Sequence, residues 1–149
     1  MIQQFAHVNV TVLDLDAAID FFGLLGLELE ARTTVEGTFL DTVIGIDGAR
    51  TEIAMLRVPG SQTRVELSCF VRPTSPPARA ALSANEPGIR TIAFVVDDLD
   101  ATVTSLADAG WGLVGGRGEF EDAWAMVYVR GPEGVVVSLA QPLDGEPGS

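Results

Sequence analysis

The chain contains a single histidine, His7, and it lies in a segment that is repeated 84 positions later without it. Residues 7–17 read H-V-N-V-T-V-L-D-L-D-A, and residues 91–101 read T-I-A-F-V-V-D-D-L-D-A. An imidazole can bind a metal ion or move a proton near neutral pH, whereas the hydroxyl of Thr91 is a poor metal ligand. The repeat therefore predicts a duplicated structural unit in which histidine chemistry is confined to the first copy.

Residues 5–12 alternate as a half-buried strand does, with His7 and Asn9 on a mixed face and four apolar residues on the other. The apolar face should meet a helix, and the mixed face suggests a lined cavity or a solvated side. We expect Asn9 to bind substrate if the mixed face lines a cavity. The alternative is that His7 is an ordinary structural or surface histidine.

The basic and sulfur-containing residues exclude several kinds of catalysis. All nine basic residues are arginine, so a Schiff-base lysine, a pyridoxal-phosphate enzyme and a P-loop are excluded. Cys69 is the only cysteine, which excludes an intramolecular disulfide and suits a reducing cytoplasm. Its place in V-E-L-S-C-F predicts a small core residue rather than a nucleophile. No Ser-His-Asp arrangement has support from spacing.

Composition also limits the partners. Twenty-one acidic residues against nine basic ones give a net charge of −12 and a pI near 4.2, which disfavours nucleic acids and anionic membranes. No apolar run approaches the ~18 residues that span a bilayer, and the N-terminus does not resemble a signal peptide. We therefore expect a cytoplasmic protein, and its 149 residues suit one domain.

Each copy should continue from its first strand into a helix and three further strands. Asp14 and Asp98 are expected as helix N-caps, and Gly26 and Gly110 as helix stops. The further strands are expected at 27–34, 50–57 and 63–69 in the first copy and at 111–117, 124–130 and 135–141 in the second. Residues 38–48 fit either a helix or a loop.

These elements predict an α+β fold built from two tandem βαβββ modules, residues 5–70 and 89–141, within one domain. Side by side, the modules would form a curled eight-stranded mixed sheet around a cavity, with the helices on its convex face. A proline-rich linker, residues 71–88, with a short helical turn at 78–84, would join them. Residues 142–149 would form a polar tail.

At this level the chain resembles the vicinal oxygen chelate superfamily, which includes glyoxalase I, methylmalonyl-CoA epimerase, extradiol dioxygenases and bleomycin-resistance proteins. The resemblance covers residues 5–141 and is nearest to the epimerase and lactoylglutathione-lyase-like branch. The segments that carry it are H-V-N-V-T-V-L-D-L-D-A-A-I-D-F-F, F-L-D-T-V-I-G-I-D-G-A-R-T-E-I-A-M-L, V-E-L, I-A-F-V-V-D-D-L-D-A and Y-V-R-G-P-E-G-V-V-V-S-L-A-Q.

In metal-dependent relatives each module supplies one ligand from its first strand and one from its last. Carried onto this chain, the resemblance implies His7 and Glu66 from the first module, but Thr91 and Ser138 from the second. Two hydroxyls at these positions depart from the usual ligands, so no cofactor is favoured; a divalent metal, if bound, would use His7 and Glu66. Glu66 could instead lie on a solvated face or pair with Arg64.

Three functions follow from the resemblance. The first is an isomerase, epimerase, cyclase or lyase that moves protons on a small oxygenated molecule with His7 and Glu66 as catalytic groups, Thr91 and Ser138 binding substrate oxygens. The second is a metal-free small-molecule-binding or antibiotic-resistance protein, in which aromatics including Trp124 and Tyr128 would contact the ligand. The third is a divalent-metal-dependent epimerase or glyoxalase-like enzyme. The resemblance also implies a homodimer.

Overall fold

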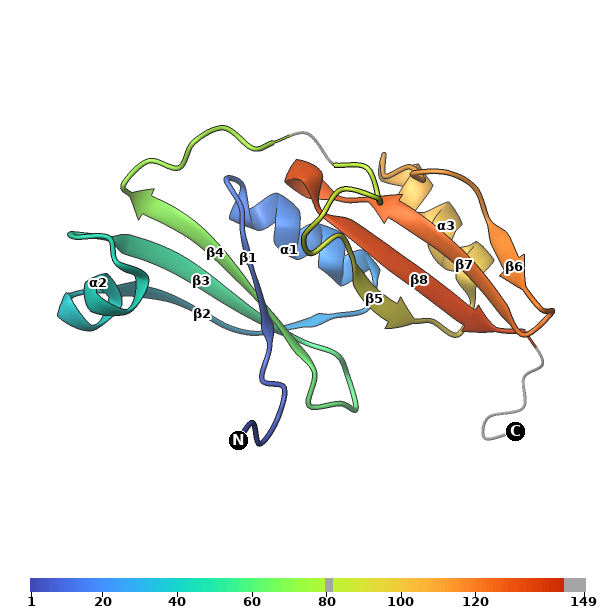
Figure 1. Ribbon diagram of the computed structural model, residues 1–149, viewed down its shortest axis with the longest axis horizontal. Coiled ribbons are helices and arrows are strands. Elements are labelled where there is room, and N and C mark those ends of the chain that lie inside the picture. The colour runs from blue at the N-terminus through green and yellow to red at the C-terminus, as the bar shows by residue number, and fades with distance from the viewer. Residues whose placement is uncertain (80–81, 144–149) are drawn as a thin grey trace. The chain divides into compact units, whose positions relative to one another are not determined.

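A strand and a helix open each of the two units into which the chain folds, residues 1–78 and 79–149. The computed structural model describes residues 1–79 and 82–143 and is shown in Figure 1. The first unit contains β1 (Val8–Thr11), α1 (Leu15–Leu24), β2 (Glu28–Glu36), α2 (Thr38–Ile44), β3 (Arg50–Arg57) and β4 (Arg64–Arg72). The second contains β5 (Ile92–Val95), α3 (Leu99–Asp108), β6 (Gly118–Phe120), β7 (Trp124–Arg130), the 3-10 turn Pro132–Gly134 and β8 (Val136–Pro142).

The eight strands form two four-stranded mixed sheets with the same topology. The strand order is β1-β4-β3-β2 in the first unit and β5-β8-β7-β6 in the second. In each sheet the first and last strands of the module pair in parallel, and the other neighbours are antiparallel. The predicted α+β class and the two βαβββ modules are therefore confirmed.

The two long helices begin and end where the repeat predicts. The carboxylates of Asp14 and Asp98 accept hydrogen bonds from the backbone N–H groups of Ala17 and Ala101, each at 3.0 Å. After each helix the chain turns through a glycine with positive φ, 97° at Gly26 and 96° at the equivalent glycine of the second unit. Glycine adopts this left-handed backbone conformation readily, because it has no Cβ that would clash with the backbone.

Each sheet buries one face against its helix. In the first unit α1 packs against β3 and β4, and in the second α3 packs against β8. Strand β7 adds the buried residues Ala125, Val127 and Val129 to the second core. The buried apolar residues include Phe21, Phe22, Leu56, Val65, Leu67, Leu99, Leu106, Val129, Val137 and Leu139. The rings of Phe21 and Phe22 meet edge to face, with centroids 5.2 Å apart. The face of each sheet that does not contact its helix carries the alternate side chains of the same strands.

Several predicted boundaries differ from the structure. Residues 38–44 form a helix, α2, which ends at Gly45 in the left-handed region. The strand predicted at 111–117 is wrong: that stretch makes one bridge, between Leu113 and Val129, and β6 begins only at Gly118. Three glycines within the stretch, at 112, 115 and 116, explain the failure, because glycine weakens strands. The smaller differences, at β1, β2, β4 and β8, concern strand ends.

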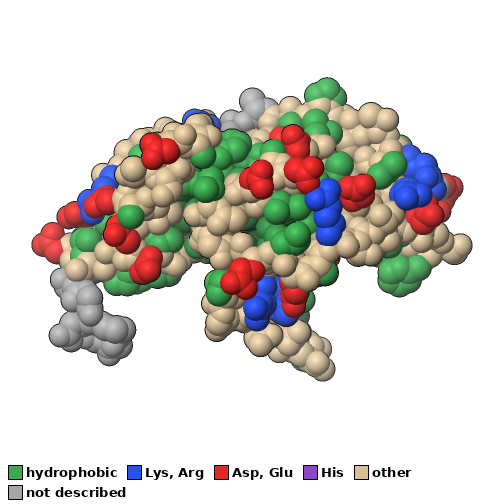
Figure 2. Space-filling model, turned by 180° about the vertical axis from the view of Figure 1, so that it is seen from behind, with side chains coloured by type: hydrophobic (Ala, Val, Ile, Leu, Met, Phe, Trp, Pro, Cys, Tyr) green, Lys and Arg blue, Asp and Glu red, His purple; other side chains and the backbone are tan. Residues whose placement is uncertain are grey.

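Two predictions fall partly outside the described residues. The helical turn predicted at 78–84 includes residues 80–81, and the polar tail predicted at 142–149 lies beyond the described range from residue 144 onward. The described residues of the first stretch contain no helix. None of the described helices is both long enough and apolar enough to cross a membrane. In Figure 2 the acidic side chains are scattered over the visible face rather than gathered in one patch.

Candidate active site

The parallel pairing of β1 with β4 brings together the predicted residues of the first module. Asn9 lies directly opposite Glu66 in the register, and Thr11 lies opposite Ser68. His7 immediately precedes β1, two residues before Asn9 and therefore on the same face of the sheet. On the other side of Glu66, the partner in β3 is Met55. The pairing of β1 with β4 thus brings His7 and Asn9 next to Glu66, although nearly sixty residues separate them in the sequence.

The Glu66 carboxylate is the centre of this cluster. Its Oε2 lies 3.6 Å from Nε2 of His7, close enough for an ion pair when the imidazole is protonated but longer than a hydrogen bond. Its Oε1 accepts a hydrogen bond of 2.8 Å from Nδ2 of Asn9. The same Nδ2 donates a second hydrogen bond of 2.8 Å to Oγ of Ser68. The polar chain therefore runs from Ser68 through Asn9 and Glu66 to His7.

Glu66 is the most shielded carboxylate among the described ion pairs. Its side chain is 19% exposed and that of His7 is 35% exposed, whereas the other paired carboxylates are 39–78% exposed. Partial burial strengthens electrostatic interactions between neighbouring charges, since less water screens them. Both groups nevertheless keep enough exposure for a small molecule to reach them.

The predicted alternative that Glu66 pairs with Arg64 is wrong. The guanidinium of Arg64 binds both oxygens of Glu30 on β2, at 2.7 and 3.0 Å. This paired hydrogen bonding lowers the pKa of Glu30 below its ordinary value and raises the pKa of Arg64. A second arginine, Arg57, lies opposite Arg64 and is 3.5 Å from Glu28. Glu66 is therefore left to His7 and Asn9.

The first module offers an incomplete set of ligands for a divalent metal ion. His7 and Glu66 would supply one nitrogen and one carboxylate, while Asn9 occupies one carboxylate oxygen with a hydrogen-bond donor. Zinc sites in proteins commonly use three or four protein ligands. Within residues 1–79 and 82–143, no three His, Cys, Asp or Glu side chains are grouped to hold a metal ion. The pair alone does not fit such an ion.

The predicted residues of the second module share one face of its sheet. Ser138 lies between Ala93 of β5 and Tyr128 of β7 in the register and is buried. Thr91 precedes β5 by one residue and alternates onto the same face, as does Trp124 along β7. This face carries hydroxyls and apolar groups where the first module carries an imidazole and a carboxylate. Their contact with substrate stays a prediction.

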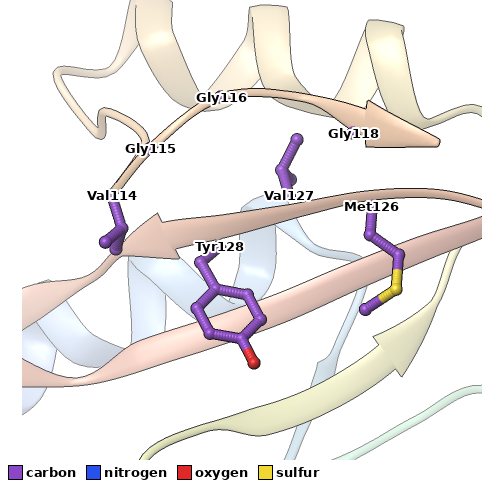
Figure 3. A pocket seen from close by; sticks show the side chains of 7 residues that line it. All are labelled: Val114, Gly115, Gly116, Gly118, Met126, Val127 and Tyr128. Carbon is purple, nitrogen blue, oxygen red and sulfur yellow. The ribbon is translucent and has the colours of Figure 1, made fainter. Parts of the chain in front are cut away.

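A pocket opens beside Tyr128 at the edge of this sheet. Its volume is about 330 Å³, and it is lined by Val114, Gly115, Gly116, Gly118, Met126, Val127 and Tyr128. Figure 3 shows Met126 and Tyr128 leaving β7 on one side and Val127 on the other, with the glycine segment opposite. Apart from the Tyr128 hydroxyl, the side chains that line it are apolar, as is usual for small-molecule sites.

The pocket results from extra chain in the glycine segment. Gly118 lies five positions after Leu113, whereas their partners Met126 and Val129 are three positions apart. The segment between the two pairs therefore bows away from β7 as a two-residue bulge. An added Cβ at Gly115 or Gly116 would meet no atom within 4 Å, so the fold does not need glycine there for space. Because both glycines line the pocket, we expect side chains at these positions to reduce its volume.

Sequence reasoning missed Ser68 and the glycine segment as site residues. The register of a parallel strand pair, which places Ser68 beside Asn9, leaves no local mark in the sequence. The glycine segment did leave a signal, since G-L-V-G-G-R-G is dense in glycine for a strand. Cys69 is half-buried, and its thiol donates to the carbonyl oxygen of Leu13 at 3.4 Å, on the side of the sheet away from Glu66.

Comparisons with known proteins agree with this architecture. Residues 6–128 match the family model of the Glyoxalase/Bleomycin resistance protein/Dioxygenase superfamily. A glyoxalase family protein from Bacillus cereus is similar in structure, with 35% sequence identity, a TM-score of 0.91 and 96% of each chain covered. No curated protein matches the sequence at a significant level.

Two more distant structures share the fold. TnmS3, an antibiotic binding protein from Streptomyces sp. CB03234, is 24% identical with a TM-score of 0.60, covering 95% of this chain and 97% of TnmS3. A glyoxalase I mutant from Zea mays is 17% identical with a TM-score of 0.65, covering 93% of this chain and 47% of the maize chain. At these identities the similarity concerns the fold alone.

Proposed function

Because the chain belongs to the Glyoxalase/Bleomycin resistance protein/Dioxygenase superfamily, we propose that it is an enzyme that moves protons on a small carbonyl compound, with His7 and Glu66 as its acid and base. The single observation that supports this most is the 3.6 Å separation of His7 Nε2 and Glu66 Oε2. The two atoms are close enough to act on adjacent atoms of one substrate, yet they are not locked in a hydrogen bond with each other.

The reaction that suits this geometry is the isomerisation of a 2-hydroxy carbonyl compound. The Glu66 carboxylate removes the proton from the carbon that bears the hydroxyl, and the C–H electron pair forms a carbon–carbon double bond. The carbonyl π electrons move to oxygen, which takes a proton from the His7 imidazolium. Glu66 then returns its proton to the former carbonyl carbon, while His7 removes the proton from the hydroxyl that the substrate carried at the start, which becomes the new carbonyl. Both residues recover their starting states, and no electrons are gained or lost.

Within the first module both groups approach from the same side of the sheet, which favours a proton taken and returned on one face of the substrate. Isomerisation needs only one such face, whereas epimerisation must deliver a proton to the opposite face. The neighbours of Glu66 also support the proposal. Met55 and Asn9 flank it on either side, and partial shielding from water strengthens its interaction with the imidazole.

Proton transfer can be tested without knowing the natural substrate. The protein is incubated in D₂O with dihydroxyacetone and glyceraldehyde, and ¹H NMR follows loss of carbon-bound hydrogen and formation of the isomer. Glu66→Gln and His7→Gln should each lower the exchange rate by about 10² or more, the usual contribution of a positioned acid or base. Both replacements keep the approximate volume of a polar side chain.

The matched control is Glu52→Gln, which changes a carboxylate on the opposite face of the same sheet. Glu52 pairs with Arg32 at 3.5 Å and lies opposite Cys69, away from His7. Its replacement should leave the exchange rate within about twofold, the scale expected of an exposed surface ion pair. Equal exchange by the unsubstituted protein and Glu66→Gln would refute the proposal.

A second candidate function, the binding of an apolar small molecule, is favoured by the pocket beside Tyr128. Its volume of about 330 Å³ and its mostly apolar lining suit a flat ring. Phe120, Trp124 and Met126 add exposed apolar surface on the same sheet face. TnmS3, which shares the fold, is described as an antibiotic binding protein. The neutral fluorophore N-phenyl-1-naphthylamine tests this role: Gly116→Val should fill the pocket and reduce its binding.

A further inference from the structure

Asn9 occupies the centre of the polar chain on the first sheet. Its side-chain nitrogen donates to Glu66 Oε1 and to Ser68 Oγ, both at 2.8 Å. An amide nitrogen carries two hydrogens, so these bonds use both of its donors inside the protein. Ser68 is 6% exposed and therefore anchors the amide from the buried end. The donors of Asn9 are committed to the protein rather than to a ligand.

This arrangement makes the two oxygens of Glu66 inequivalent. Oε1 accepts the hydrogen bond of Asn9, which fixes the plane of the carboxylate. Oε2 is then directed toward His7, at 3.6 Å from Nε2, and is the oxygen left to accept a proton. A glutamate has three rotatable side-chain bonds, so without such an anchor its carboxylate would sample several orientations.

We infer that Asn9 is a positioning residue that acts through Glu66, holding Oε2 beside His7 for proton transfer. The inference rests on the proposed function and assigns Asn9 a different role from the substrate contact that the sequence predicts. Misplacing a reacting group by about 1 Å can cost on the order of 10² in rate. The hydrogen bonds from Asn9 to Ser68 and Glu66 restrain the Glu66 carboxylate. All three residues lie on the paired strands β1 and β4 rather than on a loop.

The test combines a kinetic cycle with an NMR measurement. Exchange of carbon-bound hydrogen in dihydroxyacetone is measured for the unsubstituted protein, Asn9→Ala, Glu66→Gln and the double variant. Asn9→Ala should lower kcat about 10- to 100-fold with little change in KM, because the base is misplaced and the binding surface is kept. In the Glu66→Gln background, Asn9→Ala should have no further effect, since its partner is already inactive.

Thr11→Ala is the matched control, because Thr11 lies on the same strand and face as Asn9 and opposite Ser68. Its exchange rate should match that of the unsubstituted protein. The NMR arm needs no activity: the chain has two asparagines, Asn9 and Asn85, so their side-chain amide signals are readily told apart. Glu66→Gln should shift the Asn9 amide signals and leave those of Asn85 unchanged.

The outcomes separate the two proposals. A rise in KM with unchanged kcat in Asn9→Ala would mean that Asn9 contacts substrate, and additive losses in the double variant would mean that it does not act through Glu66. Unmoved Asn9 amide signals would contradict the hydrogen bond itself. Each of these overturns the inference while the unsubstituted protein still catalyses exchange. Absence of exchange in the unsubstituted protein overturns the proposed function, and the role of Asn9 falls with it.

Discussion

Leu67 supports the candidate site from below and allows the energetics of the first unit to be tested. It lies in β4 between Glu66 and Ser68, but its side chain points to the opposite face and is fully buried. Its neighbours in the register are Val10 on β1 and Ala54 on β3, both held by sheet hydrogen bonds. Leu67→Ala should therefore leave a cavity that the surroundings cannot easily close.

The expected loss in the free energy of unfolding is about 3 to 5 kcal/mol, the upper part of the range for buried Leu→Ala changes, because two paired strands restrict collapse. For a chain of 149 residues this corresponds to a decrease in Tm of about 6 to 20 °C. Leu139→Ala is the matched variant: Leu139 is also fully buried, is flanked by Ser138 in β8, and should cost a similar amount.

Urea unfolding at 25 °C, followed by tryptophan fluorescence and far-ultraviolet circular dichroism, measures both losses. The rate at which the protein exchanges the carbon-bound hydrogen of dihydroxyacetone in D₂O is then divided by the fraction of protein that is folded. Since Leu67 faces away from His7, its variant should keep the exchange rate per folded molecule within about threefold, below the effect of a lost acid or base. A loss of under about 1 kcal/mol would show that Leu67 is not tightly packed and would refute the reasoning.

Three further predictions concern charge, capping and the pocket. Arg64 holds the pKa of Glu30 below 4.5. The pairing therefore stabilises the fold above about pH 4.5, and this stabilisation fades as the pH falls. In Arg64→Gln, the pKa of Glu30 measured by ¹³C NMR titration should rise toward 4.5. Asp98→Ala removes the cap on the N–H of Ala101 and should cost about 1 kcal/mol in urea unfolding. Gly116→Val should change the unfolding free energy by less than about 1 kcal/mol, because an added Cβ meets no neighbour; a larger loss would contradict the described space.

The parts of the fold that local chemistry determines were predictable from the sequence. An aspartate before an apolar helix and a glycine after it act over a few residues, and for this reason Asp14 and Asp98 cap their helices as expected. The internal repeat then extends one assignment to both modules. The strand expected at 111–117 failed because apolar residues between glycines imitate a strand while the backbone bulges.

The pairing of His7 with Glu66 was predictable from the sequence, but the part played by Ser68 and the partner of Arg64 were not. The approach of His7 to Glu66 followed from the family resemblance, and the structure brings them to 3.6 Å. The partner of Arg64 is Glu30. Glu30 lies between Leu29 and Ala31, where the register of β2 against β3 shifts. Such a shift changes which side chains share a face, and residue types alone do not encode it.

The two-residue bulge in the glycine segment also makes the length of the chain here adjustable. Because a strand alternates its side chains with a period of two, deleting Gly115 and Gly116 would keep every later residue of β6 on its present face. The shortened chain could pair continuously with β7 and would have no pocket. A deletion of one residue would instead turn Phe120 to the other face. Loss or gain of chain in steps of two is therefore a simple route by which homologous proteins could close or enlarge this pocket without rebuilding the sheet.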